Sequence, residues 1–124
     1  MGLARRRAAA LAKRGRASAL TNVVPERKRT VRLLDEAMAD SEAAIAWYRA
    51  QADDEIAARF AQEIDVALDQ IANWPFSGRA YDATTHCLLL RTFPFLVFYR
   101  VTSDAIEILA VGHERRAPGF WRDR

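Results

Sequence analysis

The chain has few of the residues from which reactive sites are commonly built. Its 124 residues include one cysteine, Cys87, and two histidines that stand far apart. A single cysteine excludes a disulfide within the chain, and nothing has the spacing of a metal-ligand set. We interpret Cys87 as a small core residue rather than a nucleophile. We therefore expect no metal, no cofactor and a reducing, cytoplasmic compartment.

Long apolar runs are also missing, and no stretch approaches the length of a transmembrane helix. Near the N-terminus the run "AAALA" has five residues and is followed at once by Lys13 and Arg14. This run is too short for the apolar region of a secretory signal. We expect no membrane partner.

Lysine is confined to the first part of the chain, at Lys13 and Lys28. Residues 1–30 carry nine Lys or Arg and one acid, a net charge of +8, whereas the remaining residues carry ten arginines and fifteen acids, a net charge of −5. Pro25 and the charged run "ERKR" separate the two parts. We predict a basic, disordered extension over 1–28 and one folded domain over 29–124.

The extension allows three interpretations. It is an appended segment or the product of an over-long start, an arm that makes non-specific contact with nucleic acid, or an organelle signal. Its composition fits all three.

Hydrophobic periodicity predicts a strand at "TVRLL" (30–34) and two helices after it. Asp35 is expected to cap the first helix, which runs to Gln51. The second helix has one apolar stripe and is ended by Pro75; the stripe contains Ile56, Phe60, Ile64, Ala67, Leu68, Ile71 and Trp74. The two helices should pair as a hairpin.

Residues 76–85 are expected to form a loop, followed by strands at 86–92, 93–101 and 105–111. The middle strand is apolar on both of its alternating faces, which is typical of the centre of a sheet. The predicted class is α+β: an N-terminal strand, a helical hairpin and a three-stranded antiparallel meander, with the helices on one face of the sheet.

Three motifs give the body a family resemblance. The helix hairpin closes in "IANWPFSG", a strand pair reads "LLLRTFPFLVFYRV", and the chain ends in "ILAVGHERRAPGFWRDR". In this order they resemble the RelE/ParE superfamily of toxins from type II toxin-antitoxin (plasmid stabilisation) systems. The terminal His-x-Arg-Arg, followed by Pro and an aromatic residue, resembles the ParE-like branch most closely.

The resemblance implies a growth-inhibitory protein that a cognate antitoxin neutralises. RelE-like members cleave messenger RNA on the ribosome, whereas ParE-like members poison DNA gyrase and are not nucleases. A fold shared by both activities does not choose between them.

The residues at the nuclease positions favour the ParE-like interpretation. Aligned to the RelE-like pattern, Cys87 and Leu89 stand where lysines are expected and Leu96 where an arginine is expected. Phe120 replaces a tyrosine and Glu114 replaces an arginine. RNA cleavage needs groups that transfer protons and cations that stabilise the phosphorane, so we lean toward a protein that is not an enzyme and has gyrase as its target.

Charge supports the same choice, because residues 31–78 hold three arginines and ten acids and would repel a polyanion. Residues 79–124 are mildly positive, with seven arginines and five acids. Two alternatives stay open: a ribosome-dependent endoribonuclease that uses His113 and Arg115, since histidine titrates near neutrality, and a degenerate family member without toxicity.

We select five residues as candidates for contact with the target or the antitoxin: Arg91, Arg100, His113, Arg115 and Arg116. Arg91 and Arg100 could share a cationic patch, or pair with Glu107 across the sheet. His113 could instead cap the end of its strand. We expect Phe120 and Trp121 to pack back onto the open sheet face.

Overall fold

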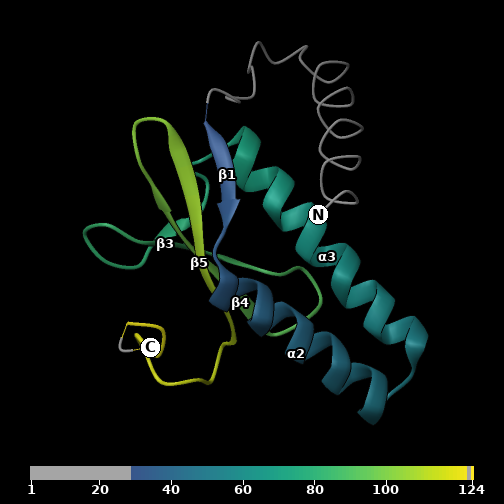
Figure 1. Ribbon diagram of the computed structural model, residues 1–124. Helices are drawn as coiled ribbons and strands as arrows, with labels where there is room; N and C mark the ends of the chain where they lie inside the picture. The colour runs from purple at the N-terminus through teal and green to yellow at the C-terminus, as the bar shows by residue number, and fades with distance from the viewer. Residues whose placement is uncertain (1–28, 123) are drawn as a thin grey trace, which may run out of the picture.

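The computed structural model describes residues 29–122 and 124, and the prediction of a disordered extension over 1–28 lies outside them. Within the described residues the order is β1 (Thr30–Leu33), α2 (Asp35–Gln51), α3 (Asp54–Asn73), β2 (Arg79–Ala80), β3 (His86–Leu89), β4 (Phe95–Val101) and β5 (Ala105–His113). The strands form one sheet (Figure 1), and their order across it is β1-β5-β4-β3-β2. Strand β1 runs parallel to β5, and the other neighbours are antiparallel. The predicted α+β class is confirmed.

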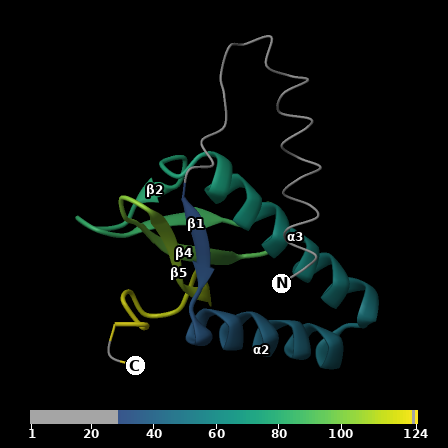
Figure 2. The same ribbon diagram turned by 45° about the horizontal axis from the view of Figure 1, so that its top comes forward.

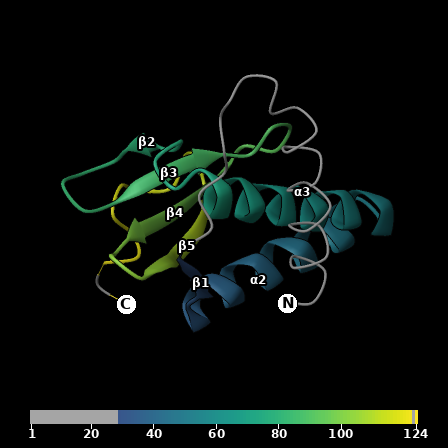
Figure 3. The ribbon, with the colours of Figure 1, turned by 90° about the horizontal axis from the view of Figure 1, so that it is seen from above.

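Helices α2 and α3 cover one face of the sheet, and the C-terminal segment lies on the other side (Figures 2 and 3). The apolar stripe of α3 supplies Phe60, which has no exposed surface, together with Ile64 and Ile71. They pack against sheet residues of the same cluster, among them Val97, Tyr99, Ile106 and Ile108. Full burial of one such side chain contributes about 1.5–3 kcal/mol, so this layer provides the main stability of the domain.

Strand β4 is central because it buries side chains on both faces, as its sequence predicts. Val97 and Tyr99 belong to the cluster under the helices, whereas Phe98 belongs to a second cluster on the opposite face. Phe98 pairs with Ala110 and Tyr99 with Ile108, which leaves Leu109 as the extra residue of a bulge in β5.

Two local predictions are wrong. The residue before α2 is Leu34, no side chain caps that end, and Asp35 is already the first helical residue. Asp35 therefore contributes only negative charge near the positive end of the helix dipole. By contrast, the Asp53 carboxylate accepts the Ile56 amide at 2.8 Å and caps α3. The expected loop over 76–85 also contains strand β2, which pairs with His86 and Cys87.

Candidate functional site

The open face of the sheet is covered by the chain's own C-terminal segment. The ring centroid of Trp121 lies 4.1 Å from that of Phe98, and Phe120 lies edge-on to both. Cys87, Ala110, Tyr81, Leu96 and Leu109 complete this cluster. The predicted packing of Phe120 and Trp121 on the open face is confirmed, and so is Cys87 as a buried residue.

Gly112, near the end of β5, makes room for this segment. A Cβ atom there would stand 2.5 Å from two ring carbons of Phe120, so a side chain and the ring cannot both occupy the space. Gly119 has a φ of +72°, a conformation that glycine adopts without steric cost. The two glycines therefore allow the segment to turn and lie flat on the sheet.

Two carboxylates hold the end of this segment. Asp40 on α2 binds both terminal nitrogens of Arg124 at 2.7 Å. The same carboxylate accepts the Val111 amide at 3.0 Å, and its hydrogen bonds to the guanidinium raise the pKa of Arg124.

The second carboxylate is Asp82, which binds Arg122. Asp82 also accepts the amides of Thr84 at 2.9 Å and Thr85 at 2.8 Å. These hydrogen bonds, that of Thr84 first, lower the pKa of Asp82 to about 2.

Four of the five predicted contact residues lie at one end of the sheet. His113, the last residue of β5, pairs with Phe95 of β4. The Phe95 carbonyl accepts the Leu90 amide at 2.9 Å, which brings Arg91 to the same end. Arg115 and Arg116 follow His113 directly, so we call Arg91, His113, Arg115 and Arg116 the cationic rim.

The rim residues differ in how firmly they are held. Nδ1 of His113 accepts the Arg115 amide at 3.1 Å, and its ring lies 5.4 Å from that of Phe95. This agrees with the alternative that His113 caps the end of its strand, and it leaves Nε2 for other partners. The Arg116 guanidinium lies 4.0 Å above the Phe120 ring, in cation–π geometry. Arg115 is exposed and makes no side-chain hydrogen bond or ion pair within the described part of the chain.

Arg100 lies at the opposite end of the sheet, so the expected patch with Arg91 is not formed. Its Nε donates to Glu107 at 3.0 Å, which confirms the cross-sheet pair for Arg100 but not for Arg91. The reason is the antiparallel register: Arg91 follows the end of β3, whereas Arg100 precedes the end of β4.

The positions that align with nuclease residues of RelE-like toxins hold apolar side chains or make backbone contacts within the fold. Cys87 and Leu96 lie in the open-face cluster beside Phe120, and the Glu114 amide donates to Pro94 at 2.8 Å. Leu89 is exposed, but it carries neither charge nor titratable group.

In the described chain, no group of three His, Cys, Asp or Glu residues could hold a metal ion. No helix among these residues is long and apolar enough to cross a membrane.

Sequence reasoning missed Asp40, Asp82 and Gly112, which hold the C-terminal segment in place. Asp40 and Arg124 are 84 positions apart, so no local pattern connects them. Gly112 offered a signal, because a glycine inside a strand often marks close approach of another segment. A small α+β protein with an apolar open face and a cationic rim is the class that this geometry defines.

Comparison with known proteins places the chain within that class. A family model described as "ParE toxin of type II toxin-antitoxin system, parDE" matches residues 31–118. A protein of Sinorhizobium fredii (strain NBRC 101917 / NGR234) named "Putative toxin Y4kP" is 36% identical over 86 residues, covering 68% of this chain and 80% of that protein. The chain belongs to the ParE toxin family of type II toxin-antitoxin systems.

A solved structure supports the fold. The structure titled "Chromosomal ParDE TA system from P. aeruginosa" matches with a TM-score of 0.63 at 21% identity, covering 71% of this chain and 98% of that one. At this level of identity the match speaks for the architecture alone.

Proposed function

We propose that this ParE-family toxin arrests growth by binding DNA gyrase and that it does not cut RNA. One observation carries the proposal: the open face is filled by Phe98, Phe120 and Trp121. Cleavage of a phosphodiester would need cations and proton-transfer groups on that face. Of the arginines near it, Arg100, Arg122 and Arg124 are each paired with a carboxylate. Arg79 donates to the Cys87 sulfur and Arg116 stacks on the Phe120 ring, and among the described residues no histidine or carboxylate belongs to the cluster beside them.

The contact with gyrase is assigned to the cationic rim. A guanidinium presents a planar set of donors that suits carboxylate and amide acceptors of a protein partner. Arg115 has its full hydrogen-bonding capacity left for such a partner, since nothing within the described residues engages its side chain.

A cognate antitoxin is the second partner in this proposal. Among the described residues, three large apolar side chains are more than half exposed: Trp47 at 57%, Phe76 at 62% and Leu89 at 54%. Exposed aromatic and aliphatic side chains of this size are favourable anchors for a protein partner.

The test is induced expression of the full chain, with plasmid supercoiling and total RNA followed in parallel. We expect relaxed or cleaved plasmid DNA while messenger RNA stays intact. Purified protein should inhibit gyrase supercoiling in vitro without ribosomes. Codon-periodic RNA cleavage with normal supercoiling would refute the proposal, and normal growth would favour a degenerate, non-toxic member.

An endoribonuclease is kept as a second candidate because His113 stands at the rim with Nε2 available. This candidate requires that His113→Ala or Arg115→Ala abolish RNA cleavage. The gyrase proposal instead expects no cleavage with either variant or with the unmodified chain.

A further inference from the structure

The C-terminal half of helix α3 is buried on nearly all sides. From Ile64 to Asn73, every residue is buried except Val66 and Gln70. A helix that covers one face of a sheet ordinarily keeps a polar, solvated stripe on its outer side, whereas burial all round is typical of a helix covered on both sides. The burial pattern therefore points to a second covering layer on the side of α3 away from the sheet.

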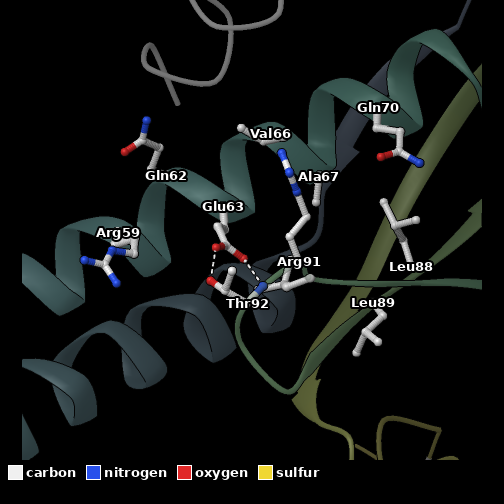
Figure 4. A pocket seen from close by; sticks show the side chains of 11 residues that line it. Arg59, Gln62, Glu63, Val66, Ala67, Gln70, Leu88, Leu89, Arg91 and Thr92 are labelled. Atoms are coloured by element: carbon white, nitrogen blue, oxygen red, sulfur yellow. Dashed lines mark hydrogen bonds between the residues drawn. The ribbon is translucent and has the colours of Figure 1, made fainter.

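The sheet side of α3 is accounted for by contacts within the described chain. Toward β3, a groove separates α3 from residues 88–92, and Arg59 and Arg91 lie on its two walls (Figure 4). Glu63 bridges this groove, because its carboxylate accepts the Thr92 amide at 3.0 Å. These contacts all lie on the side of the helix that faces the sheet.

Polar side chains lie on the opposite, outer side of α3. Asp69 follows the core residue Phe60 by nine positions, about two and a half turns, so the two side chains point in opposite directions. Asp65, Asp69 and Asn73 are spaced by four residues and form one line along the helix. All three are buried, with exposed fractions of 8%, 4% and 4%. We call this line the outer stripe.

The outer stripe specifies the chemistry of what covers it. The Asn73 side-chain amide donates to the Asp69 carboxylate at 3.2 Å, but an amide is neutral and cannot balance two negative charges. Burial of a carboxylate is strongly unfavourable unless a cation pairs with it. Ala72 lies beside the stripe and is 6% exposed, so the covering layer also brings apolar surface. The occupant is therefore cationic and partly apolar.

Residues 1–28 of this chain have that composition. They hold eight Lys or Arg and one acid, a net charge of +7, and the stretch "RRRAAALAKRGR" interleaves cations with alanine and leucine. Residues 31–78, by contrast, hold three arginines and ten acids. The two charges are complementary, and complementary charge favours association and fixes its register.

The point at which this segment joins the domain brings the outer stripe within its reach. Arg29 donates from Nε to the Thr102 carbonyl at 2.7 Å, and its guanidinium lies 5.6 Å from the ring centroid of Phe76. Phe76 closely follows the end of α3 at Asn73, so the segment joins the domain beside the C-terminal end of this helix. The stripe from Asn73 back to Asp65 is about 12 Å long, which about four extended residues span.

We propose that residues 1–28 bind in cis along the outer stripe, with Lys and Arg side chains of this segment paired with Asp65 and Asp69. Considered alone, a segment of this composition is expected to stay disordered. Beside the stripe it has a buried partner of opposite charge. The contact lies within one chain, so it does not depend on the target of the toxin.

Nucleic acid is the competing partner for the same cations. A helix face within the same chain is present at a high effective concentration, whereas nucleic acid must be recruited from solution. The acids of residues 31–78 also repel a polyanion near this segment. We therefore expect the segment to occupy the stripe at low salt and to leave it when salt screens the ion pairs.

The experiment attaches a nitroxide at Ser18→Cys in the full chain and records by NMR which amide signals it broadens. Cys87 is 2% exposed, so the label reacts with the new thiol. At low salt the amides of Gln70 and Asn73 should broaden, whereas that of Trp121, on the opposite face of the sheet, should not. The broadening should disappear at about 1 M salt, where charges are screened beyond about 3 Å.

The double variant Asp65→Asn/Asp69→Asn in the labelled chain removes both carboxylates at constant size. It should reduce the broadening at Asn73 at least about fivefold. The matched control Glu42→Gln/Glu55→Gln removes two exposed carboxylates of the helices outside the stripe, and should change the broadening less than about twofold.

A third variant tests the same pairing from the segment. Lys13→Gln/Arg14→Gln/Arg16→Gln leaves the described domain unaltered and should also reduce the broadening at α3. This variant decides the question if the double variant in α3 does not fold.

Two results would overturn the contact. One is broadening at α3 that is equal in the double variant, its control and the unmodified chain. The other is absence of broadening at α3 at low salt; if residues 1–28 then bind a short DNA duplex, the segment is a nucleic-acid-binding arm instead.

Discussion

Gly112 shows how one missing side chain decides what covers a sheet face. The Phe120 ring occupies the position where a Cβ atom of residue 112 would lie. With the ring in place, Phe120 and Trp121 bury the open face around Phe98. The absence of a methyl group in β5 therefore keeps an apolar face out of water.

We expect Gly112→Ala to displace Phe120 and to lower the free energy of unfolding by about 1–3 kcal/mol, the usual cost of overpacking. Urea denaturation measures the loss. Emission of Trp121, recorded with Trp47 and Trp74 replaced by Phe, should shift to the red as the ring becomes hydrated. Adding Phe120→Ala removes the clash, so the double variant should lose less than the sum of the two single losses; strict additivity would contradict this account.

Asp82 makes stability depend on pH in the acidic range. Its pKa is lowered from 3.8 to about 2 in the folded chain, so the carboxylate is favoured by folding. The stabilisation is fully present above 3.8 and disappears as the pH falls through about 2.

We therefore expect Asp82→Asn to lower the urea midpoint by a constant amount above about pH 4, with the difference from the unmodified chain closing between about pH 4 and about pH 2. Midpoints measured across this range in both proteins provide the comparison, since other carboxylates titrate equally in the two. A difference that persists unchanged to about pH 2 would show that Asp82 is not the titrating group.

At the scale of elements, Asp40 joins three parts of the chain that are distant in sequence. It stands on α2, accepts the amide of Val111 in β5, and binds the guanidinium of Arg124. Its side chain is largely buried, and that of Arg124 is about three-quarters buried. One carboxylate thus links a helix, a strand and the C-terminal segment.

We expect Asp40→Ala to cost about 2–3 kcal/mol, because it leaves both the Val111 amide and the guanidinium without their acceptor. Arg124→Ala should cost about 1 kcal/mol, because the carboxylate keeps the amide. Thermal and urea unfolding of both variants and of the double variant give the free energies of unfolding for a double-mutant cycle. Equal losses for the two single variants would mean that the Val111 contact contributes nothing.

On the scale of the whole molecule, two binding surfaces are expected to act separately. The cationic rim is assigned to the target, and the exposed apolar side chains Trp47, Phe76 and Leu89 to the antitoxin. Trp47 and Arg115 belong to one surface each, so variants at these two positions can separate the two activities.

Arg115→Glu should weaken inhibition of gyrase supercoiling at least about tenfold and leave antitoxin affinity within about twofold. Trp47→Ala should show the opposite pattern, because it removes an exposed apolar anchor on α2 and leaves the rim unchanged. Both variants are compared with the unmodified chain by inhibition titrations and by calorimetry with the polypeptide encoded beside its gene. If both variants affected both activities to the same degree, the two surfaces would be one.

The sequence by itself determined both helices, four of the five strands and their order, because periods of 3.6 and 2 residues are local properties. It missed strand β2, which is only two residues long. It placed β4 at the centre through its two apolar faces, and it identified the family through motifs at the chain's end. The prediction that Asp35 caps α2 was wrong, because a shift of one position decides whether an acidic residue caps a helix or is its first residue.

Only the tertiary structure decided which side chains meet. The antiparallel register places Arg100 beside Glu107 and Arg91 beside α3. Packing of α3 against the sheet places Arg59 opposite Arg91. The fold of the C-terminal segment places Arg124 against Asp40. Contacts between residues so far apart arise from strand pairing and helix packing over the whole domain, and these leave no trace in the spacing of either residue along the chain.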